Sequence, residues 1–267
     1  MIIKNLIKKK FFDLIKNILK KLNLKVLRLN AYNNLIKNQS NDFDIKFIKT
    51  IESKNIEDVL KYFDKSQSQI RQDLFVASEL NFKKDGFFVE FGAADGKYLS
   101  NTYFLEKELG WKGIIAEPSK SFHKKLFVNR KCSISKDCVW KYSNSLLSFY
   151  EAGTPELSLL KEYHAQDSYD RNYIGNYNVK SISLSDLLLE YNAPKKIDYI
   201  SIDTEGSEFD ILSNFNFQNY DIKIITCEHL FHLNRKLINE LLINNGFIQK
   251  YKDLSAHEDW YINPSFY

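Results

Sequence analysis

Acidic residues stand at the ends of apolar segments, where a carboxylate can hold a ligand or take up a proton. The run Phe87-Phe-Val-Glu90-Phe-Gly92-Ala93-Ala-Asp95-Gly96 is an apolar segment that ends in a turn with two glycines. Glycines at such a turn let the backbone approach a ligand closely, and a carboxylate there accepts hydrogen bonds from hydroxyl or ammonium groups. The GxGxxG spacing of a dinucleotide site is absent, and the acids Glu90 and Asp95 would repel phosphate. The turn therefore favours a cationic, phosphate-free nucleoside ligand; the alternative is a turn whose acids are only solvated.

A second acid, Glu117, ends the apolar run Gly113-Ile-Ile-Ala-Glu117-Pro118-Ser119, about 20 residues beyond the first turn. Acids at this position of α/β nucleoside sites hold the two ribose hydroxyls. Asp137, near the end of the next apolar run, could accept from an adenine amino group, although an exposed acid in a turn explains it equally well. S-adenosylmethionine, a sulfonium nucleoside without phosphate, has the character that these acids predict.

Later segments carry candidates for a general base. Asp203 and Glu205 follow the apolar run Tyr199 to Ile202, and the pair Glu228-His229 ends the run that starts at Lys223. An alcohol is too weak an acid to ionise freely, so a reaction at a ligand hydroxyl needs a nearby base. Asp203 and His229 are the leading candidates and Glu205 is a third, while core packing is the alternative for His229.

The same residues could instead form a metal-binding site. Asp203, Glu205, Glu228 and His229 offer the oxygen and nitrogen ligands that could hold Mg²⁺ against two hydroxyls of a ligand and lower a hydroxyl pKa. The sequence does not decide between a metal and a base. Glu208 is expected to cap the helix that begins there.

Apolar runs and helical patterns alternate along the chain and predict the elements that position these acids. Predicted strands cover 87–91, 113–116, 134–139, 199–202, 223–227, 247–251 and 260–262. Predicted helices cover 69–80, 100–109, 119–129, 184–191, 208–212 and 233–244. Strands that alternate with helices indicate a mostly parallel sheet with helices on both faces, and ligands of such sheets bind at the carboxyl ends of the strands.

Several motifs in this order resemble the FkbM family of S-adenosylmethionine-dependent methyltransferases. They are FFVEFGAADGKYLSNT, IIAEPS, SLSDLL, IDYISIDTEGSEFDIL and Glu228-His229, and the resemblance covers roughly residues 66 to 262. It implies a Rossmann-like class I methyltransferase fold with a seven-stranded sheet, and methyl transfer to oxygen, frequently on a sugar or polyketide hydroxyl in surface-glycan pathways. The chain departs from the family at Ala94, where members often carry Asn. The cofactor-binding residues expected from the motifs are Glu90, Gly92, Ala93, Asp95, Gly96, Ser100, Asn101, Glu117, Pro118, Asp137 and Asp203.

Charge separates an N-terminal extension, residues 1–65, from a methyltransferase domain, residues 66–267. Nine basic residues against Asp13 give residues 1–30 a charge of +8, so the rest of a chain of net charge +4 carries −4. The basic part has apolar residues at helical spacing, which predicts an amphipathic helix that either contacts an anionic membrane surface or packs on the protein itself. Residues 141–180 interrupt the alternation and predict an insertion, either a source of acceptor contacts or a solvated loop.

Composition narrows the remaining choices. The chain has 267 residues, 44% of them hydrophobic, and three cysteines without a CxxC pair, which fits a folded protein of the reducing cytoplasm. The acidic body argues against a nucleic-acid partner. The expected partner is a small-molecule or glycan acceptor with a free hydroxyl. A metal-dependent nucleotide-sugar glycosyltransferase, with Asp203-Thr-Glu205 as its metal motif, and a non-catalytic membrane scaffold are the alternatives.

Overall fold

The computed structural model describes residues 42–267 except 165–170, 230–233, 255 and 267. All the elements named below belong to residues 47–267, which form one unit by their contacts. The predicted amphipathic helix of residues 1–30 lies outside the described residues.

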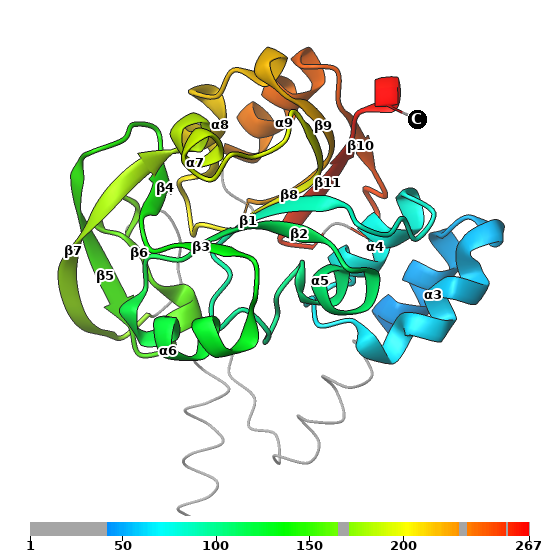
Figure 1. The fold of residues 1–267 in the computed structure, drawn as a ribbon, viewed down its shortest axis with the longest axis horizontal. Coiled ribbons are helices and arrows are strands. Elements are labelled where there is room, and N and C mark those ends of the chain that lie inside the picture. The colour runs from blue at the N-terminus through cyan, green and yellow to red at the C-terminus, as the bar shows by residue number, and fades with distance from the viewer. Residues whose placement is uncertain (1–41, 165–170, 230–233, 255, 267) are drawn as a thin grey trace, which may run out of the picture. The chain divides into compact units, whose positions relative to one another are not determined.

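A seven-stranded sheet forms the centre of this unit, in the order β10-β11-β9-β8-β1-β2-β3. Neighbouring strands are parallel except that β11 runs antiparallel to both β9 and β10. The predicted seven-stranded, mostly parallel sheet is thus confirmed (Figure 1). Its strands are β1 (Phe87–Phe91), β2 (Lys112–Ala116), β3 (Ser133–Ser135), β8 (Lys196–Ile202), β9 (Asp221–Glu228), β10 (Ile248–Lys250) and β11 (Glu258–Ile262).

The register of the four central strands brings their carboxyl ends to one edge. Phe91, the last residue of β1, pairs with Ala116 of β2 and with Ile202 of β8, and Ile202 pairs with Cys227 of β9. The residues of chemical interest at this edge are Gly92, Glu117, Asp203 and Glu228. The topology therefore gathers acids that lie up to 111 positions apart, as the sequence predicts for a parallel sheet.

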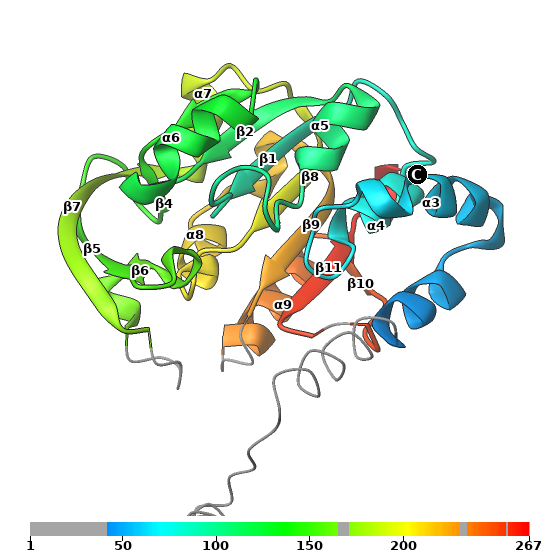
Figure 2. The ribbon, with the colours of Figure 1, turned by 90° about the horizontal axis from the view of Figure 1, so that it is seen from below.

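Helices cover both faces of the sheet. The connections after β1 and β2 place α5 and α6 on one side together with α4, whereas α7, α8 and α9 lie on the other (Figures 1 and 2). Their bounds are α4 (Gln72–Glu79), α5 (Tyr103–Leu109), α6 (Lys120–Asn129), α7 (Leu184–Glu190), α8 (Glu208–Ser213) and α9 (Asn234–Asn244). Helix α9 ends in a glycine cap, since Gly246 has a φ of 86° and the Phe247 N–H donates to the Leu242 carbonyl.

Apolar runs in the central strands explain the burial of the sheet on both faces. Every residue of β8 after Lys196 is buried, and Val89, Ile114, Ile200 and Ile225 meet in one core cluster. Burial of each such side chain stabilises the fold by about 1.5–3 kcal/mol, and a continuous apolar run is typical of a parallel strand covered on both faces.

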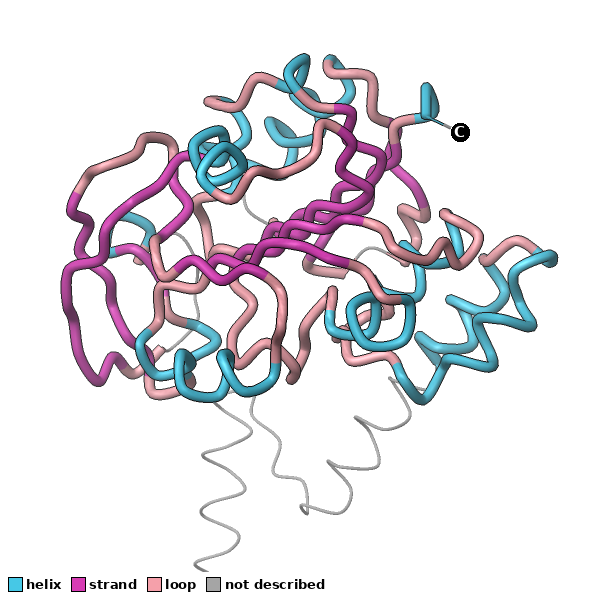
Figure 3. Tube along the Cα trace, viewed as in Figure 1, coloured by secondary structure: helices cyan, strands magenta, loops and turns pink. Residues whose placement is uncertain are grey.

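A second sheet has the order β4-β7-β5-β6 and stands beside the first as a separate group of strands (Figure 3). Its strands are β4 (Cys138–Trp140), β5 (Leu146–Ala152), β6 (Leu159–Leu160) and β7 (Tyr173–Ser183). The segment 141–180 thus contains β5, β6 and most of β7, with the short helices η3 (Pro155–Leu157) and η4 (Lys161–Tyr163) between them. The single strand predicted at 134–139 is wrong: it is β3 in the first sheet and β4 in the second, because the chain changes sheets at Lys136-Asp137.

Short helices precede α4. They are η1 (Ser53–Asn55), α3 (Ile56–Tyr62) and η2 (Phe63–Lys65), and a further helix, η5 (Phe217–Asn219), leads into β9, while η6 (Pro264–Phe266) ends the fold. Within the described part of the chain, no helix combines the length and the apolar character needed to cross a bilayer.

Candidate functional site

A cavity of about 480 Å³ opens at the carboxyl ends of β1, β2, β8 and β9. Its volume lies in the range of small-molecule and cofactor sites. The residues that line it from the four strand ends are Phe91, Gly92, Ala93, Ala94, Ala116, Glu117, Pro118, Asp203, Thr204, Glu205, Ser207 and Glu228. The cavity therefore occupies the edge where the sequence predicts the ligand.

The turn after β1 forms the floor of this cavity. Gly92 has a φ of 74°, and a Cβ atom on it would lie 1.7 Å from the Asp203 carbonyl oxygen, so only glycine fits. Ala94 also has a left-handed backbone, with φ 49°, a conformation that Asn tolerates better than Ala. The turn therefore forms with Ala at position 94, but the Ala94 backbone is strained.

Glu117 joins this turn to the next strand end. Its Oε2 accepts from the Ala94 N–H at 2.9 Å, its Oε1 accepts from the Ser119 N–H at 2.8 Å, and its side chain lines the cavity. Burial raises the pKa of Glu117 to about 8, against the two backbone donors that lower it, and the nearby Asp203 and Glu90 raise it further. Each carboxyl oxygen keeps a lone pair for a ligand hydroxyl. Pro118, the next residue, also lines the cavity.

Glu90 does not line the cavity, contrary to the sequence prediction of a ligand contact. Its carboxylate is 2% exposed and accepts from the Asn101 N–H at 2.7 Å and from the hydroxyls of Thr102 and Ser100 at 2.5 and 3.1 Å. Arg130 pairs with it from behind at 3.4 Å. Glu90 and Ser100 therefore position the loop that carries Asn101, rather than contacting the ligand.

Asn101 lines the cavity together with Tyr98 and Leu99 of the same loop. Its Nδ2 donates to the Ser201 hydroxyl at 2.9 Å, whereas its buried Oδ1 has no hydrogen-bond partner among the described residues. A buried acceptor without a partner is costly, so Oδ1 is well suited to accept a hydrogen bond from a bound ligand.

Asp95 and Gly96, two further predicted cofactor contacts, serve the turn and its packing instead. Asp95 Oδ1 accepts from the N–H groups of Lys97 and Tyr98 at 2.9 and 2.8 Å. A Cβ atom on Gly96 would lie 2.5 Å from Leu126 of α6, so this glycine lets α6 pack closely. Neither residue lines the cavity.

Asp137, the predicted adenine contact, is also absent from the cavity lining. Its carboxylate lies 3.5 Å from Lys180 Nζ on β7. The next two residues, Cys138 and Val139, line the cavity instead, because the chain turns into β4 at this point. The residue predicted from the sequence, Asp137, is therefore adjacent in sequence to Cys138, which lines the cavity.

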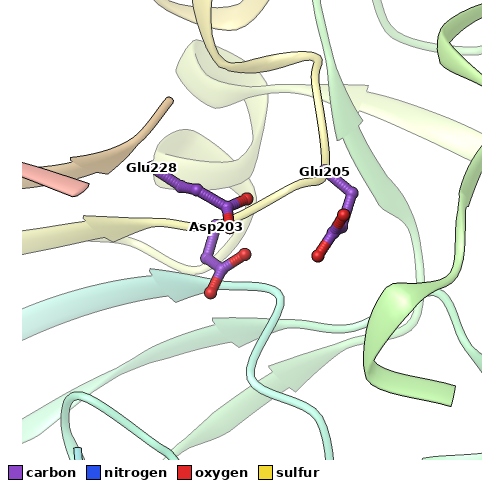
Figure 4. Close-up of side chains that lie close together, drawn as sticks. All are labelled: Asp203, Glu205 and Glu228. Carbon is purple, nitrogen blue, oxygen red and sulfur yellow. The ribbon is translucent and has the colours of Figure 1, made fainter. Parts of the chain in front are cut away.

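Asp203, Glu205 and Glu228 form a cluster in the cavity wall (Figure 4). One oxygen from each of the three carboxylates lies within 4.8 Å of the other two. Burial is the largest cause that raises the pKa of all three above their ordinary values. The charge of Asp203 raises the pKa of Glu205 and Glu228 further, whereas a hydrogen bond with Glu228 partly offsets the rise for Asp203. The sequence prediction that these acids meet at one edge is consistent with this arrangement.

The loop that follows β8 is held in an uncommon shape. Glu205 has a left-handed backbone, with φ 57°, and its carboxylate pairs with Arg171. Glu208 accepts from the N–H groups of Thr204 and Gly206, both at 3.0 Å, which agrees with its predicted place at the start of α8. A strained residue fixed by such contacts is common at functional sites.

His229 does not line the cavity, whereas His257 does. The His229 N–H donates to the His257 carbonyl at 2.8 Å, and His229 Nε2 lies 3.5 Å from Asp259 Oδ1. Successive residues of an extended chain point to opposite sides, so Glu228 faces the cavity and His229 faces away. Burial, and then the charge of His229, lowers the pKa of His257. The sequence could have indicated His257 by its position directly before the last strand. That strand starts at Glu258, two residues before the predicted start at Trp260.

Strands β5 and β6, the segment that connects them, and the residues around the start of α4 supply most of the remaining wall. These residues were not named from the sequence, because nothing in their types marks them as ligand contacts. They are Gln69, Gln72, Phe149, Thr154, Pro155, Glu156, Leu157, Ser158 and Leu160.

The strand order, with one antiparallel strand between two others at the edge, and the acidic cavity at the strand ends are those of the class I methyltransferase fold. The Methyltransferase FkbM domain model matches residues 90–252, more than half of the chain. The chain therefore belongs to the FkbM methyltransferase family.

No match was found among curated protein sequences. Among solved structures, the chain is similar to precorrin-6y C5,15-methyltransferase from Geobacter metallireducens GS-15, at 10% identity over 71% of this chain and 85% of that chain, with a TM-score of 0.39. It is also similar to ribosomal protein L11 methylase from Lactobacillus delbrueckii subsp. bulgaricus, at 9% identity over 72% of this chain and 75% of that chain, with a TM-score of 0.39.

Proposed function

We propose that this methyltransferase transfers the methyl group to a hydroxyl oxygen of a sugar, in a surface-glycan precursor of the capsule or lipopolysaccharide type or in a nucleotide-linked sugar. The observation that carries the proposal is the cluster Asp203, Glu205 and Glu228, which lies in the same cavity as Glu117. A hydroxyl acceptor needs a group that takes its proton, and carboxylates at the cofactor edge meet that need.

The cavity residues fit S-adenosylmethionine. Glu117 is placed to accept from the ribose hydroxyls, the turn from Gly92 to Ala94 lines the cavity beside it, and the Asn101 Oδ1 offers an acceptor. The apolar part of the wall, with Phe122 and Val139, suits a purine ring. When bound, this cofactor supplies an electrophilic methyl group on sulfur.

The chain has two tasks in the reaction: to align the acceptor oxygen and to receive its proton. In our proposal Asp203 receives the proton as the new C–O bond forms. Glu205, which Arg171 holds in place, orients the acceptor hydroxyl. His229 has no part in the proposal, because it faces Asp259 rather than the cavity.

The cavity wall favours an uncharged sugar ring over a phosphate group. Hydroxyl and amide side chains from the second sheet and α4, Thr154, Ser158, Gln69 and Gln72, offer hydrogen bonds to a polyol. No Lys or Arg is present among the described residues that line the cavity, so a diphosphate inside it would meet carboxylates with no cationic side chain to offset their repulsion. A glycan end is thus the better supported acceptor, and a nucleotide-linked sugar would keep its diphosphate outside. Because the chain belongs to a methyltransferase family, we do not propose a glycosyltransferase or a non-catalytic membrane scaffold.

The proposed place of the reaction is the cytoplasm, where the cofactor and glycan precursors are made. Peripheral contact of residues 1–30 with the inner membrane face is a prediction from their charge alone. A nucleic-acid partner is not part of the proposal.

The test is transfer of a deuterated methyl group from S-adenosylmethionine to a panel of monosaccharides, nucleotide sugars and short glycans, read by mass spectrometry and NMR. We expect an O-methyl product on a sugar. Asp203→Asn should lower kcat strongly while the cofactor Kd stays unchanged, and Asp137→Asn, outside the cavity, serves as the control. A product methylated on nitrogen or carbon would contradict the proposal.

A further inference from the structure

Three carboxylates from two neighbouring strand ends converge on one point of the cavity. Asp203 and Glu205 belong to the loop after β8, Glu228 ends β9, and one oxygen of each lies within 4.8 Å of the others (Figure 4). All three line the cavity, so a ligand in the cavity can reach the space that they face.

An independent observation concerns the Glu228 side chain. Glu228 is 4% exposed, and no N–H or hydroxyl group among the described residues donates to its Oε2. The side-chain hydrogen bond that Glu228 makes is to the Asp203 carboxyl, another acid. In Figure 4 its carboxylate is directed toward Asp203. A buried carboxylate oxygen without a donor is costly, and a cation is one ligand that would satisfy it.

The cationic side chains near the cluster do not balance the charge of its three carboxylates. Arg171 pairs with Glu205, and no Lys or Arg occurs among the described lining residues. One guanidinium for three carboxylates leaves the cluster negative whenever the acids are ionised. The cofactor's sulfonium is a competing source of positive charge, so the test must separate it from a metal.

We propose that Asp203, Glu205 and Glu228 bind a divalent cation, Mg²⁺ or Mn²⁺, that holds the acceptor through a hydroxyl or a pair of neighbouring hydroxyls. Opposite oxygens around Mg²⁺ lie about 4.0–4.2 Å apart and around Ca²⁺ about 4.6–5.2 Å, so the observed spacing needs only side-chain rotation to close on a cation. Mg²⁺ keeps several waters when carboxylates bind it, and a diol can replace two of them.

The assignment rests on the proposed function for the identity of the acceptor and removes His229 from the ligand set. His229 faces Asp259 and is not part of the cluster. In the reaction the cation would lower the pKa of the bound hydroxyl and hold the oxygen in line. The carboxylates of the cluster would then bind the metal through some of their oxygens and receive the proton through another.

The test is a titration of the full chain with Mn²⁺, after dialysis against EDTA and without cofactor, read by electron paramagnetic resonance of free Mn²⁺. We expect one bound Mn²⁺ per chain that Mg²⁺ displaces. Glu228→Gln and Asp203→Asn should each weaken binding by about 100-fold or more. Glu258→Gln is the matched control, because Glu258 is a buried acid that pairs in register with Glu228 but lies outside the cluster. Circular dichroism checks that each variant is folded.

Failure of the inference and of the proposed function give different results. Wild-type protein that binds no Mn²⁺ at millimolar concentration overturns the metal site, and this result does not depend on any variant. Binding that Glu228→Gln and Asp203→Asn leave intact also overturns it. Sugar methylation that EDTA does not affect, in a chain that binds no Mn²⁺, leaves the proposed function standing without the metal. Mn²⁺ binding that the cluster variants abolish, without any sugar product, supports the site and contradicts the proposed acceptor.

Discussion

The carbonyl oxygen of Asp203 lies 1.7 Å from the point that a Cβ atom on Gly92 would occupy. The first turn of the cavity and the loop that carries the acid cluster are thus in direct backbone contact. A change at Gly92 must displace Asp203, although the two residues are separated by 110 positions.

Gly92→Ala should therefore lower the free energy of unfolding by about 3 kcal/mol or more, because the new methyl group overlaps the Asp203 backbone and the φ of 74° disfavours a side chain. Urea denaturation measures the change. Gly175→Ala is the matched control, because no atom lies within 4 Å of its added Cβ, and it should change the free energy by less than about 0.5 kcal/mol. Equal effects of the two substitutions would contradict the close contact.

Arg130 is the buried cation behind the same turn. Its side chain is fully buried and donates to Glu106 at 2.6 Å, to the Gly96 carbonyl at 3.1 Å and to Thr102 at 2.8 Å. Arg130→Leu should destabilise the fold by about 3–5 kcal/mol, since Glu90 would keep a buried charge without its counterion. Lys236→Leu, which removes an exposed ion pair with Glu240, should change stability by less than about 0.5 kcal/mol in the same denaturation experiment.

The sequence predicts both Glu117 and Asp137 as cofactor contacts, Glu117 on the stronger grounds, and the structure places only Glu117 in the cavity lining. Glu117→Ala should weaken S-adenosylmethionine binding by about 10- to 100-fold, the equivalent of a charge-assisted hydrogen bond, because this carboxylate lines the cavity. Asp137→Asn should leave the Kd unchanged, because its carboxylate faces Lys180. Calorimetric titration measures both. A larger loss in Asp137→Asn than in Glu117→Ala would reverse this assignment.

The pattern of strands could be predicted from the sequence because each central strand is an apolar run that ends in Gly or in an acid. Glu117 and Asp203 follow such runs directly, so a parallel sheet had to bring them to one edge. The chain gave no such cue at Lys136-Asp137, where a polar pair separates β3 from β4. Whether a chain moves from one sheet to another depends on which strand edge is free to pair. Local residue types do not indicate this, so the sequence does not predict the change of sheet.

The direction of individual side chains was less predictable than the position of the strand ends. Glu90 and Glu228 each stand near a strand end, yet Glu90 faces Arg130 and Glu228 faces the cavity. His229 was assigned to the cavity by its adjacency to Glu228, although neighbouring residues of an extended chain point to opposite sides. The sequence does not predict His257 as a cavity residue, because its position beside Glu228 and His229 depends on the antiparallel pairing of β9 with β11.

His229 and His257 should accordingly respond differently to substitution. His257→Asn should lower kcat/KM for the acceptor by about tenfold, the equivalent of one lost hydrogen bond in the cavity. His229→Asn should instead reduce stability by about 1–3 kcal/mol through its contact with the buried Asp259, with kcat/KM of the folded protein unchanged. Steady-state kinetics and urea denaturation of both variants separate the two roles. Loss of turnover in a fully stable His229→Asn protein would restore its role as a base.

The raised pKa of Glu117 predicts how the stability of the cofactor-free protein depends on pH. Its pKa is about 8 in the folded chain against an ordinary value of 4.5, so the folded state binds more protons between these values. Folded-state stability must then fall as pH rises through this window, because the unfolded chain ionises the carboxyl freely while the folded chain does so only at a cost.

Glu117→Gln removes this dependence. The substitution also removes a hydrogen-bond acceptor for the Ala94 or Ser119 N–H, and that loss is the same at every pH. The melting temperature of Glu117→Gln relative to wild type should therefore rise steadily between about pH 5 and pH 8 and level off above it. Calorimetric scans across this range test the sign, with Glu190→Gln as an exposed control. A difference that stays constant with pH would mean that Glu117 is ionised in the folded protein at pH 5, with its buried charge stabilised by the two backbone donors.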